Sequence, residues 1–204
     1  MPEKHLDTYY VRHLYPELTA RYYRLFGPVR RVLDVGCGLG SMGLYKPSEA
    51  VQVFGVDHDA GALSEARRWE YVSVCDLEDG HLPFPDQAFD AVLAKDVLEH
   101  FLRPWRIVNE IQRVLVAGGQ VVVSVPMPKP AIVWNDYTHV RGFSRNALRQ
   151  MLVDAHLEVV HIVQMGSLRG FGRLHLVDWL PVIMNLPVIG YHLAVNYELL
   201  ARKP

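Results

Sequence analysis

The chain has 204 residues, of which half are hydrophobic, and its 21 basic and 22 acidic residues leave a formal net charge of −1. A chain of this length can bury a full core and lies near the upper end of the usual size of one domain, so we expect a single domain over residues 1–204. The near-neutral charge attracts no nucleic acid and the amino terminus lacks an apolar signal core, which predicts a cytoplasmic protein with no nucleic-acid partner.

Short apolar segments alternate with helical patterns along the chain. A helix is expected at 9–25, strands near 31–35, 51–56, 71–75, 89–94 and 120–125, and helices near 60–69, 104–116 and 144–155. The glycines of Ala117-Gly118-Gly119 should end the helix before the fifth strand. Two further strands are expected at 157–163 and 192–201. This alternation predicts an α/β fold whose parallel sheet is covered on both faces and binds ligands at the carboxyl ends of its strands.

The first strand runs into a glycine-rich segment, Val-Leu-Asp-Val-Gly-Cys-Gly-Leu-Gly at residues 32–40. A Cβ at Gly36, Gly38 or Gly40 would forbid the positive φ angles of a tight strand-to-helix turn or fill space that a ligand needs. The segment therefore predicts a cofactor cradle, although a glycine-rich turn is also a purely structural device.

The second strand ends in Asp57-His58-Asp59, and a carboxylate in this place can accept hydrogen bonds from both hydroxyls of a ribose. A nicotinamide or flavin dinucleotide would satisfy the same features. Two details argue against it: Ser41 stands near where the third glycine of the dinucleotide fingerprint belongs, and Pro47 shortens the helix that would cap a pyrophosphate.

Three further motifs follow in order. The strand at 72–75 ends at Asp76-Leu77, His81-Leu82-Pro83-Phe84-Pro85-Asp86 leads into the apolar segment 89–94, and Asp96-Val97-Leu98-Glu99-His100 comes next. In this order the chain resembles the class I S-adenosylmethionine-dependent methyltransferases, in particular the small-molecule branch that includes the ubiquinone and menaquinone methyltransferases. The resemblance extends from Val32 to Val125 and more weakly to Ala155.

The resemblance implies a Rossmann-like, doubly wound, mostly parallel seven-stranded sheet with an antiparallel last strand, and S-adenosyl-L-methionine as cofactor, with S-adenosyl-L-homocysteine as product. We divide the domain accordingly into an N-terminal helical lid at 1–28, a cofactor-binding core at 29–163, an apolar insertion at 164–190 and the last strand at 191–204.

Carried over to this sequence, the resemblance also implies individual roles in cofactor binding. The three loop glycines would pack against methionine and ribose, Asp57 would bind the ribose hydroxyls, and Asp34 would orient the methionine amino group. Adenine would contact Asp76 and the Leu77 backbone, while Ala94 and Lys95 would lie beneath the methionyl arm. Cys37 and His58, which adjoin these residues, complete the expected cofactor site.

Methyl transfer from a sulfonium is an in-line displacement, so positioning and exclusion of water account for most of the catalysis. A base is needed only where the acceptor must lose a proton. His139 and His100 are the candidates, with His139 preferred because it lies in a loop; either can instead be a structural histidine. Asp96, Glu99 and His100 resemble a metal cluster, but metal-dependent catechol methyltransferases place their acids differently, so no metal is expected.

Two segments should select the acceptor. Tyr9 and Tyr10 in the N-terminal lid, together with Trp134 and Tyr137, are expected to bind it. The apolar segment 174–189 is either packed in the core or forms a wall for a lipid- or glycan-linked acceptor, a peripheral membrane contact or a homodimer surface. It contains Asp178, Asn185, Pro181 and Pro187, which make it a poor membrane span.

The sequence thus predicts an enzyme that methylates oxygen, nitrogen or carbon of a small or lipid-linked molecule. Two alternatives remain open. One is a methyltransferase-like binding module that has lost catalysis, and the other is a nicotinamide-dependent oxidoreductase.

Overall fold

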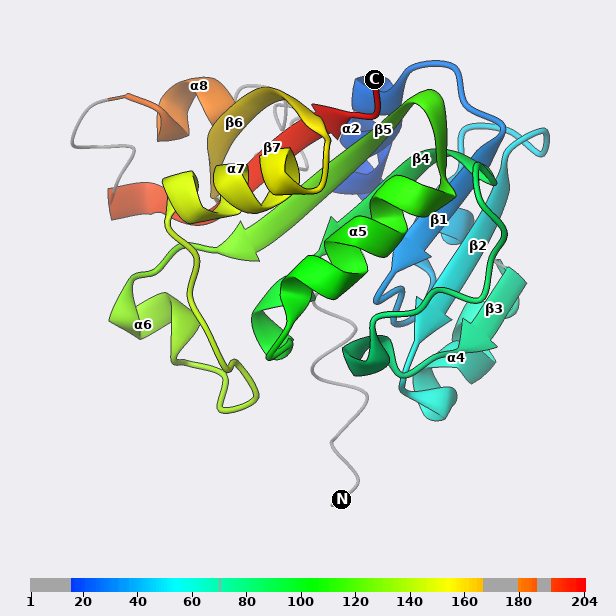
Figure 1. The fold of residues 1–204 in the computed structure, drawn as a ribbon, viewed down its shortest axis with the longest axis horizontal. Helices are drawn as coiled ribbons and strands as arrows, with labels where there is room; N and C mark the ends of the chain where they lie inside the picture. Colours follow the sequence, from blue (N-terminus) through cyan, green and yellow to red (C-terminus); the bar gives the residue numbers. More distant parts are fainter. Residues whose placement is uncertain (1–15, 70, 167–179, 187–191) are drawn as a thin grey trace.

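The computed structural model describes residues 16–69, 71–166, 180–186 and 192–204 (Figure 1). Seven strands form one sheet in the order β3-β2-β1-β4-β5-β7-β6. Their bounds are β1 (Arg31–Val35), β2 (Gln52–Asp57), β3 (Tyr71–Val74), β4 (Phe89–Lys95), β5 (Leu115–Pro126), β6 (Glu158–Gly166) and β7 (Ala194–Arg202). The first five strands pair in parallel, and β7 pairs antiparallel with both β5 and β6. The predicted mostly parallel sheet with an antiparallel last strand is confirmed.

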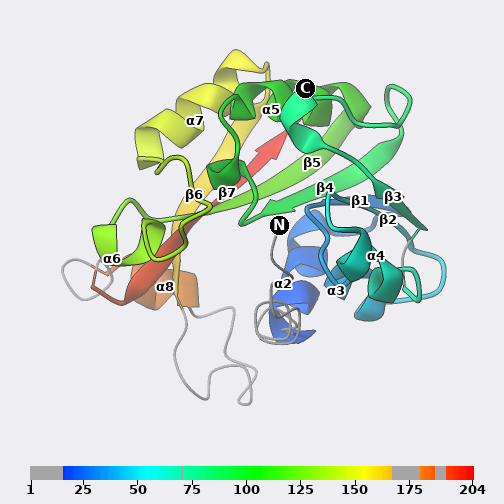
Figure 2. The ribbon, with the colours of Figure 1, turned by 90° about the horizontal axis from the view of Figure 1, so that it is seen from below.

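Helices cover both faces of this sheet (Figures 1 and 2). The helices are α2 (Pro16–Phe26), α3 (Ser41–Leu44), α4 (Ala60–Ala66), α5 (Pro104–Val114), α6 (Pro130–Val133), α7 (Arg145–Asp154) and α8 (Leu180–Met184), with single 3₁₀ turns η2 (Leu77–Asp79) and η3 (Leu98–His100). In Figure 2, α5 and α7 lie on one side of the sheet, and α2, α3 and α4 lie on the other. In the described part of the chain, no helix is long and apolar enough to cross a bilayer.

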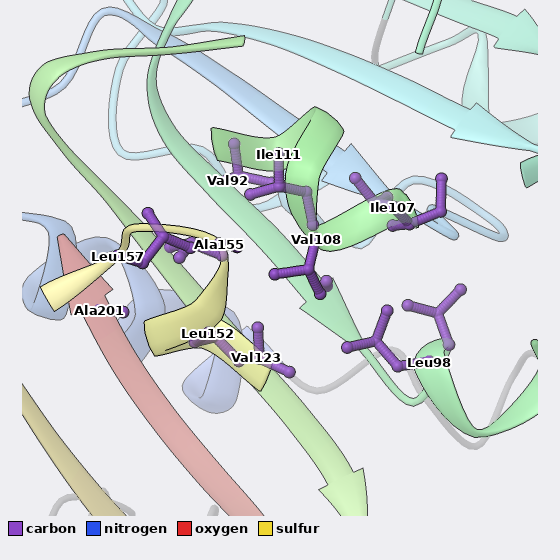
Figure 3. Packing of buried hydrophobic residues seen from close by; sticks show 14 of the residues in the cluster. Val92, Leu98, Ile107, Val108, Ile111, Val123, Leu152, Ala155, Leu157 and Ala201 are labelled. Carbon is purple, nitrogen blue, oxygen red and sulfur yellow. The ribbon is translucent and has the colours of Figure 1, made fainter. Parts of the chain in front are cut away.

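The alternation of side chains along β4 explains why its sequence is apolar throughout. Ala91 and Leu93 belong to a buried cluster with Tyr22 of α2. Val92 and Ala94 point to the opposite face, where they join a cluster that includes Ile107 of α5. Figure 3 shows part of this second cluster, with Val92, Ile107, Val108 and Ile111 packed together. A strand that is buried on both faces loses the polar alternation of a half-exposed strand, as in other parallel sheets.

The helix boundaries differ from the prediction in two places. Helix α4 ends at Ala66, and α5 ends at Val114 rather than at the glycines 118 and 119. Leu115, the residue after α5, is already extended, pairs with Phe89 and is fully buried. Sheet pairing and burial of Leu115 therefore end the helix, and the glycines lie within β5, where its pairing with β4 is irregular. For the helix expected at 9–25, the part from Pro16 is present as α2, and residues 9–15 lie outside the described residues.

A buried ion pair joins α2 to the sheet. Arg21 Nη1 lies 2.5 Å from Glu198 Oε1 of β7, and both side chains are almost inaccessible to solvent. Removal of one partner of such a pair leaves an uncompensated buried charge, whereas its replacement by two apolar side chains is often neutral. No sequence pattern indicated this pair, because its members are 177 positions apart.

We expect Arg21→Met to lower the free energy of unfolding by about 3–5 kcal/mol, because Glu198 loses its counter-charge. The double variant with Glu198→Met should recover most of this loss, as measured by urea denaturation. A double variant no more stable than Arg21→Met would contradict this account of the pair.

Candidate active site

The glycine loop between β1 and α3 is tied to the end of β2. The amides of Gly36 and Cys37 both donate to the carbonyl of Val56, at 2.8 and 3.1 Å. Gly36, Gly38 and Gly40 have φ angles of 73°, 51° and 79°, so all three occupy the left-handed region that glycine tolerates best. The predicted strand-to-helix turn with positive φ angles is confirmed.

Two of these glycines are also required by contacts within the protein. A Cβ at Gly36 would lie 2.9 Å from Cγ2 of Val97, and a Cβ at Gly40 would lie 3.0 Å from the Cα of Ala66. The loop therefore presses against the segment after β4 on one side and against α4 on the other. Packing alone demands glycine at both positions, whether or not a ligand is bound.

The second-strand acid, Asp57, holds the loop by its carboxylate. Its Oδ2 accepts a hydrogen bond from the Gly38 amide at 2.9 Å, and its Oδ1 accepts one from the Asp59 amide at 3.0 Å. Burial alone would raise the pKa of Asp57, but the hydrogen bonds from His58, Asp59 and Gly38 outweigh burial and lower it. Asp57 is therefore ionised at neutral pH. A carboxylate has about four acceptor sites, so Asp57 can accept further hydrogen bonds beside those from the loop.

Asp34, near the end of β1, has the opposite electrostatic character. The residue is buried, and burial together with the charge of Asp57 raises the pKa of its carboxyl to about 7, although Lys95 opposes the shift. A positively charged group bound beside Asp34 would favour the ionised form of this carboxyl.

The ends of β4, β5 and β7 meet in a polar cluster around Asp96. Asp96 accepts hydrogen bonds from the ammonium of Lys95 and, at 2.5 Å, from the amide of Asn196, which also donates to Ser124 Oγ at 3.0 Å. Asp96 itself has a φ of 51°, unusual for a residue other than glycine. Sequence analysis missed Ser124 and Asn196; the signal was a buried polar residue that interrupts an apolar strand.

The remaining cofactor candidates have different surroundings. Asp76 lies just after β3 and caps η2, where its carboxylate accepts from the Glu78 amide at 3.0 Å. Ala94 is fully buried at the end of β4. The side chain of His58 is largely exposed and lies 3.3 Å from Asp57. Cys37 is buried in a cluster with Leu63 and Ala66 of α4. The structure thus brings the predicted cofactor residues to the carboxyl ends of β1 to β4.

The two candidate bases lie together, with Glu99 beside them. The rings of His100 and His139 are 4.7 Å apart, and His139 Nε2 lies 3.9 Å from Glu99 Oε1. Glu99 is fully buried, and neither carboxyl oxygen has a hydrogen-bond partner among the described residues. Burial and the charge of Asp96 raise the pKa of Glu99 well above its usual range. One nitrogen or oxygen from each of the three lies within 4.8 Å of the others, close enough for a metal ion to fit between them.

The residues expected to bind the acceptor are either exposed or outside the described part of the chain. The side chains of Trp134 and Tyr137 are exposed, Tyr137 to 82%. Tyr9 and Tyr10 lie outside the described residues, as do 174–179 and 187–189 of the apolar segment. Within the described part of that segment, Met184 is buried against Met127 and Met165. A cavity of about 640 Å³ lies elsewhere, between α5 and α7, and includes none of the predicted site residues in its lining.

The effect of packing on Gly36 can be separated from that of its φ angle. Gly27 also has a positive φ, of 65°, but a Cβ there would meet nothing within 4 Å. We expect Gly27→Ala to cost about 1 kcal/mol from backbone strain alone, and Gly36→Ala to cost clearly more because Val97 must move. Equal losses of stability in urea denaturation would show that the contact with Val97 is unimportant.

The raised pKa of Asp34 predicts how stability depends on pH. Between about pH 4 and about pH 7 the native carboxyl keeps a proton that the unfolded chain has released, so the free energy of unfolding should fall as pH rises through that range. Each unit of the pKa shift corresponds to about 1.4 kcal/mol.

Urea denaturation of the wild type and of Asp34→Asn, at several pH values across this range, measures the effect. The variant cannot ionise, so it should gain stability relative to the wild type as pH rises. Parallel pH profiles for the two proteins would mean that Asp34 has an ordinary pKa.

Residues 33–123 match a family model described as a methyltransferase domain. A probable S-adenosylmethionine-dependent methyltransferase of Mycobacterium tuberculosis is 31% identical over 179 residues, which cover 83% of this chain and 62% of that protein. The chain therefore spans less than two thirds of the length of this relative.

Two other similarities bear on function. A probable tRNA methyltransferase 9B of Mus musculus is 37% identical over 148 residues, covering 71% of this chain and 32% of that protein. The crystal structure of the cyclase SpnF matches with a TM-score of 0.67 and 25% identity, over 93% of this chain and 79% of that one. The strand order is that of the class I methyltransferase fold, and the domain match and the mycobacterial relative make the chain similar to S-adenosylmethionine-dependent methyltransferases, which implies S-adenosyl-L-methionine as the cofactor.

Proposed function

We propose that this protein transfers a methyl group from S-adenosyl-L-methionine to a small or lipid-linked acceptor. The observation that carries the proposal is the pair of acids at the ends of β1 and β2, one with a raised and one with a lowered pKa, beside a turn of three glycines with positive φ angles. This combination offers what the cofactor requires: a carboxylate for the ribose hydroxyls, a second acid for a cationic group, and between them a turn whose glycines carry no side chains.

The residues fit the cofactor on chemical grounds. The ammonium of its methionine part would favour the charged form of Asp34, whose burial is otherwise costly. Asp57 would bind the ribose while it holds the Gly38 amide, so ribose binding and loop geometry depend on one side chain. Asp76 and the Leu77 backbone at the end of β3 would bind adenine. The bound cofactor supplies an electrophilic methyl group on a sulfonium, and the chain needs mainly to orient the acceptor and exclude water.

A small acceptor is favoured over tRNA by the way the basic residues are used. Arg141, Arg145 and Arg149 recur every four residues, a spacing that would form a phosphate-binding face on a helix, but α7 begins at Arg145 and Arg141 lies in the loop before it. In addition, the Arg141 guanidinium donates to the carbonyls of Phe101 and Leu102, and that of Arg145 donates to the Ile162 carbonyl. Both guanidinium groups are therefore held by backbone carbonyls of the protein itself, in the loop after η3 and in β6. A tRNA acceptor remains the second candidate because of the similarity to the mouse tRNA methyltransferase.

A third candidate follows from the similarity to SpnF, which is a cyclase. A cyclase catalyses a different reaction from methyl transfer. Label transfer separates the three candidates: methyl-labelled S-adenosylmethionine is incubated with the protein and either a small-molecule and lipid extract or bulk tRNA. We expect label in the first fraction. Label confined to tRNA would overturn the small-acceptor proposal, and cofactor binding without any transfer would favour the cyclase-like alternative.

The cofactor assignment is tested by Asp57→Ala, with Asp90→Ala as the matched control. The Asp90 carboxylate likewise accepts two backbone amides, those of Arg30 and Arg31 at 2.8 Å each, but at the start of β4. Because hydrogen bonds to a charged group contribute about 1.5–3 kcal/mol, Asp57→Ala should weaken S-adenosylhomocysteine binding by roughly 10- to 100-fold in titration calorimetry. Asp90→Ala should leave the affinity unchanged. Equal affinities in both variants would refute the ribose assignment.

A further inference from the structure

We propose that Asp136 and Thr138 are positioning residues that fix His100 with its Nε2 ready to take a proton from a hydroxyl acceptor. This inference rests on the proposed methyl transfer and narrows the acceptor to a hydroxyl compound. It also makes His100 the preferred general base, whereas the sequence alone favoured His139.

The side chains of Asp136, Thr138 and His100 are linked in this order by hydrogen bonds. Thr138 Oγ1 lies 2.6 Å from Asp136 Oδ1, and an ionised carboxylate only accepts, so the hydroxyl proton points to Asp136. The Thr138 amide donates to the same Oδ1 at 2.8 Å, which fixes the side chain relative to the loop. The hydroxyl oxygen lies 3.1 Å from His100 Nδ1 and has no second proton to give. Nδ1 must therefore be the donor, and in the neutral ring Nε2 is the acceptor.

His139 has the same tautomer as His100, but the surroundings of its Nε2 differ. Its Nδ1 lies 2.5 Å from the carbonyl of Val133, which can only accept, so Nδ1 is protonated here too. Its Nε2 then faces the buried Glu99 at 3.9 Å, and only 9% of its side chain is exposed. The nitrogen that would act as base thus points into the protein. His100 is only half-buried, and the side-chain hydrogen bond to its ring is at Nδ1, from the side where Thr138 lies.

The groups around His100 keep its ring neutral. Burial and the charge of His139 lower the pKa of His100, while Asp136, a hydrogen bond with the Thr138 backbone and Asp96 act in the opposite direction without cancelling the effect. Glu99 adds little negative charge, because burial raises its own pKa. His100 is consequently a base at neutral pH, and Asp136 stabilises the imidazolium through Thr138 when a proton arrives.

Methyl transfer to a hydroxyl acceptor involves one proton transfer, one new bond and one broken bond. The acceptor hydroxyl gives its proton to Nε2 of His100, and its oxygen forms the new bond to the methyl carbon. The carbon–sulfur bond breaks, and its electron pair remains on sulfur as a neutral thioether. The imidazolium then returns the proton to water, and the product is a methyl ether.

The tautomer can be measured without knowing the acceptor. In protein labelled with ¹⁵N-histidine, long-range ¹H–¹⁵N correlation spectra distinguish the two neutral tautomers, and His100→Gln assigns the resonance. We expect His100 to be protonated at Nδ1. Thr138→Val should abolish this preference, and Thr138→Ser, which keeps the hydroxyl, should retain it. Asp136→Asn should lower the pKa of His100, because the negative charge that raises it is removed.

Other results would overturn the proposal. These are a wild-type ring protonated at Nε2, a Thr138→Val spectrum like that of the wild type, or a stoichiometric metal ion in the purified protein, which would occupy a ring nitrogen. A labelled product methylated on nitrogen or carbon would also refute the hydroxyl acceptor. Binding of S-adenosylhomocysteine checks folding and the proposed function separately: Thr138→Val should bind it as the wild type does, whereas failure of the wild type to bind it would refute methyl transfer and leave the tautomer result intact.

Discussion

The site depends on two buried carboxyl groups, Asp34 and Asp57, held at the ends of neighbouring parallel strands. Like charges in a buried environment repel, so both cannot be ionised at low cost. Hydrogen bonds resolve the conflict, because the Gly38 and Asp59 amides and His58 stabilise the charge of Asp57. Asp34 then remains the acid whose ionisation is unfavourable, and its pKa is raised to about 7. The glycine loop is thus part of the electrostatics as well as of the shape, since without the Gly38 amide Asp57 would lose a partner that keeps it ionised.

The sheet provides the constraint that brings these groups together. Strands β1, β2, β3 and β4 are parallel, so the residues that follow them meet at one edge. Both faces of β4 are buried, by α2 on one side and α5 on the other, so the strand has little freedom to slide. A one-residue slip would exchange Leu93 and Val92 between the two faces and displace Lys95 and Asp96 from the polar cluster.

The sequence predicted the strand ends well and the side-chain partnerships poorly. Asp57 and Asp76 end apolar segments, so their common position follows from the topology of a parallel sheet. The pairing of Asp96 with Asn196 joins residues 100 positions apart, and neither periodicity nor composition reports such contacts. The same holds for Arg21 and Glu198. His139 was preferred as the base because loops carry function, but the direction of a ring nitrogen depends on which carbonyl lies within reach, here that of Val133.

The acceptor side of the site is built differently from the cofactor side. Strand ends and a close-packed glycine turn position the cofactor residues, whereas the loop that carries Thr138 is fastened to η3. The amides of Val140 and Arg141 both donate to the Glu99 carbonyl, and the Arg141 guanidinium donates to the two carbonyls after η3. This attachment brings His100 and Thr138 together although they are 38 positions apart. Because the attachment uses backbone carbonyls and one arginine, other side chains of the loop can change without moving His100. A change of acceptor would therefore require new residues in the loop, while the strand ends proposed to bind the cofactor stay the same.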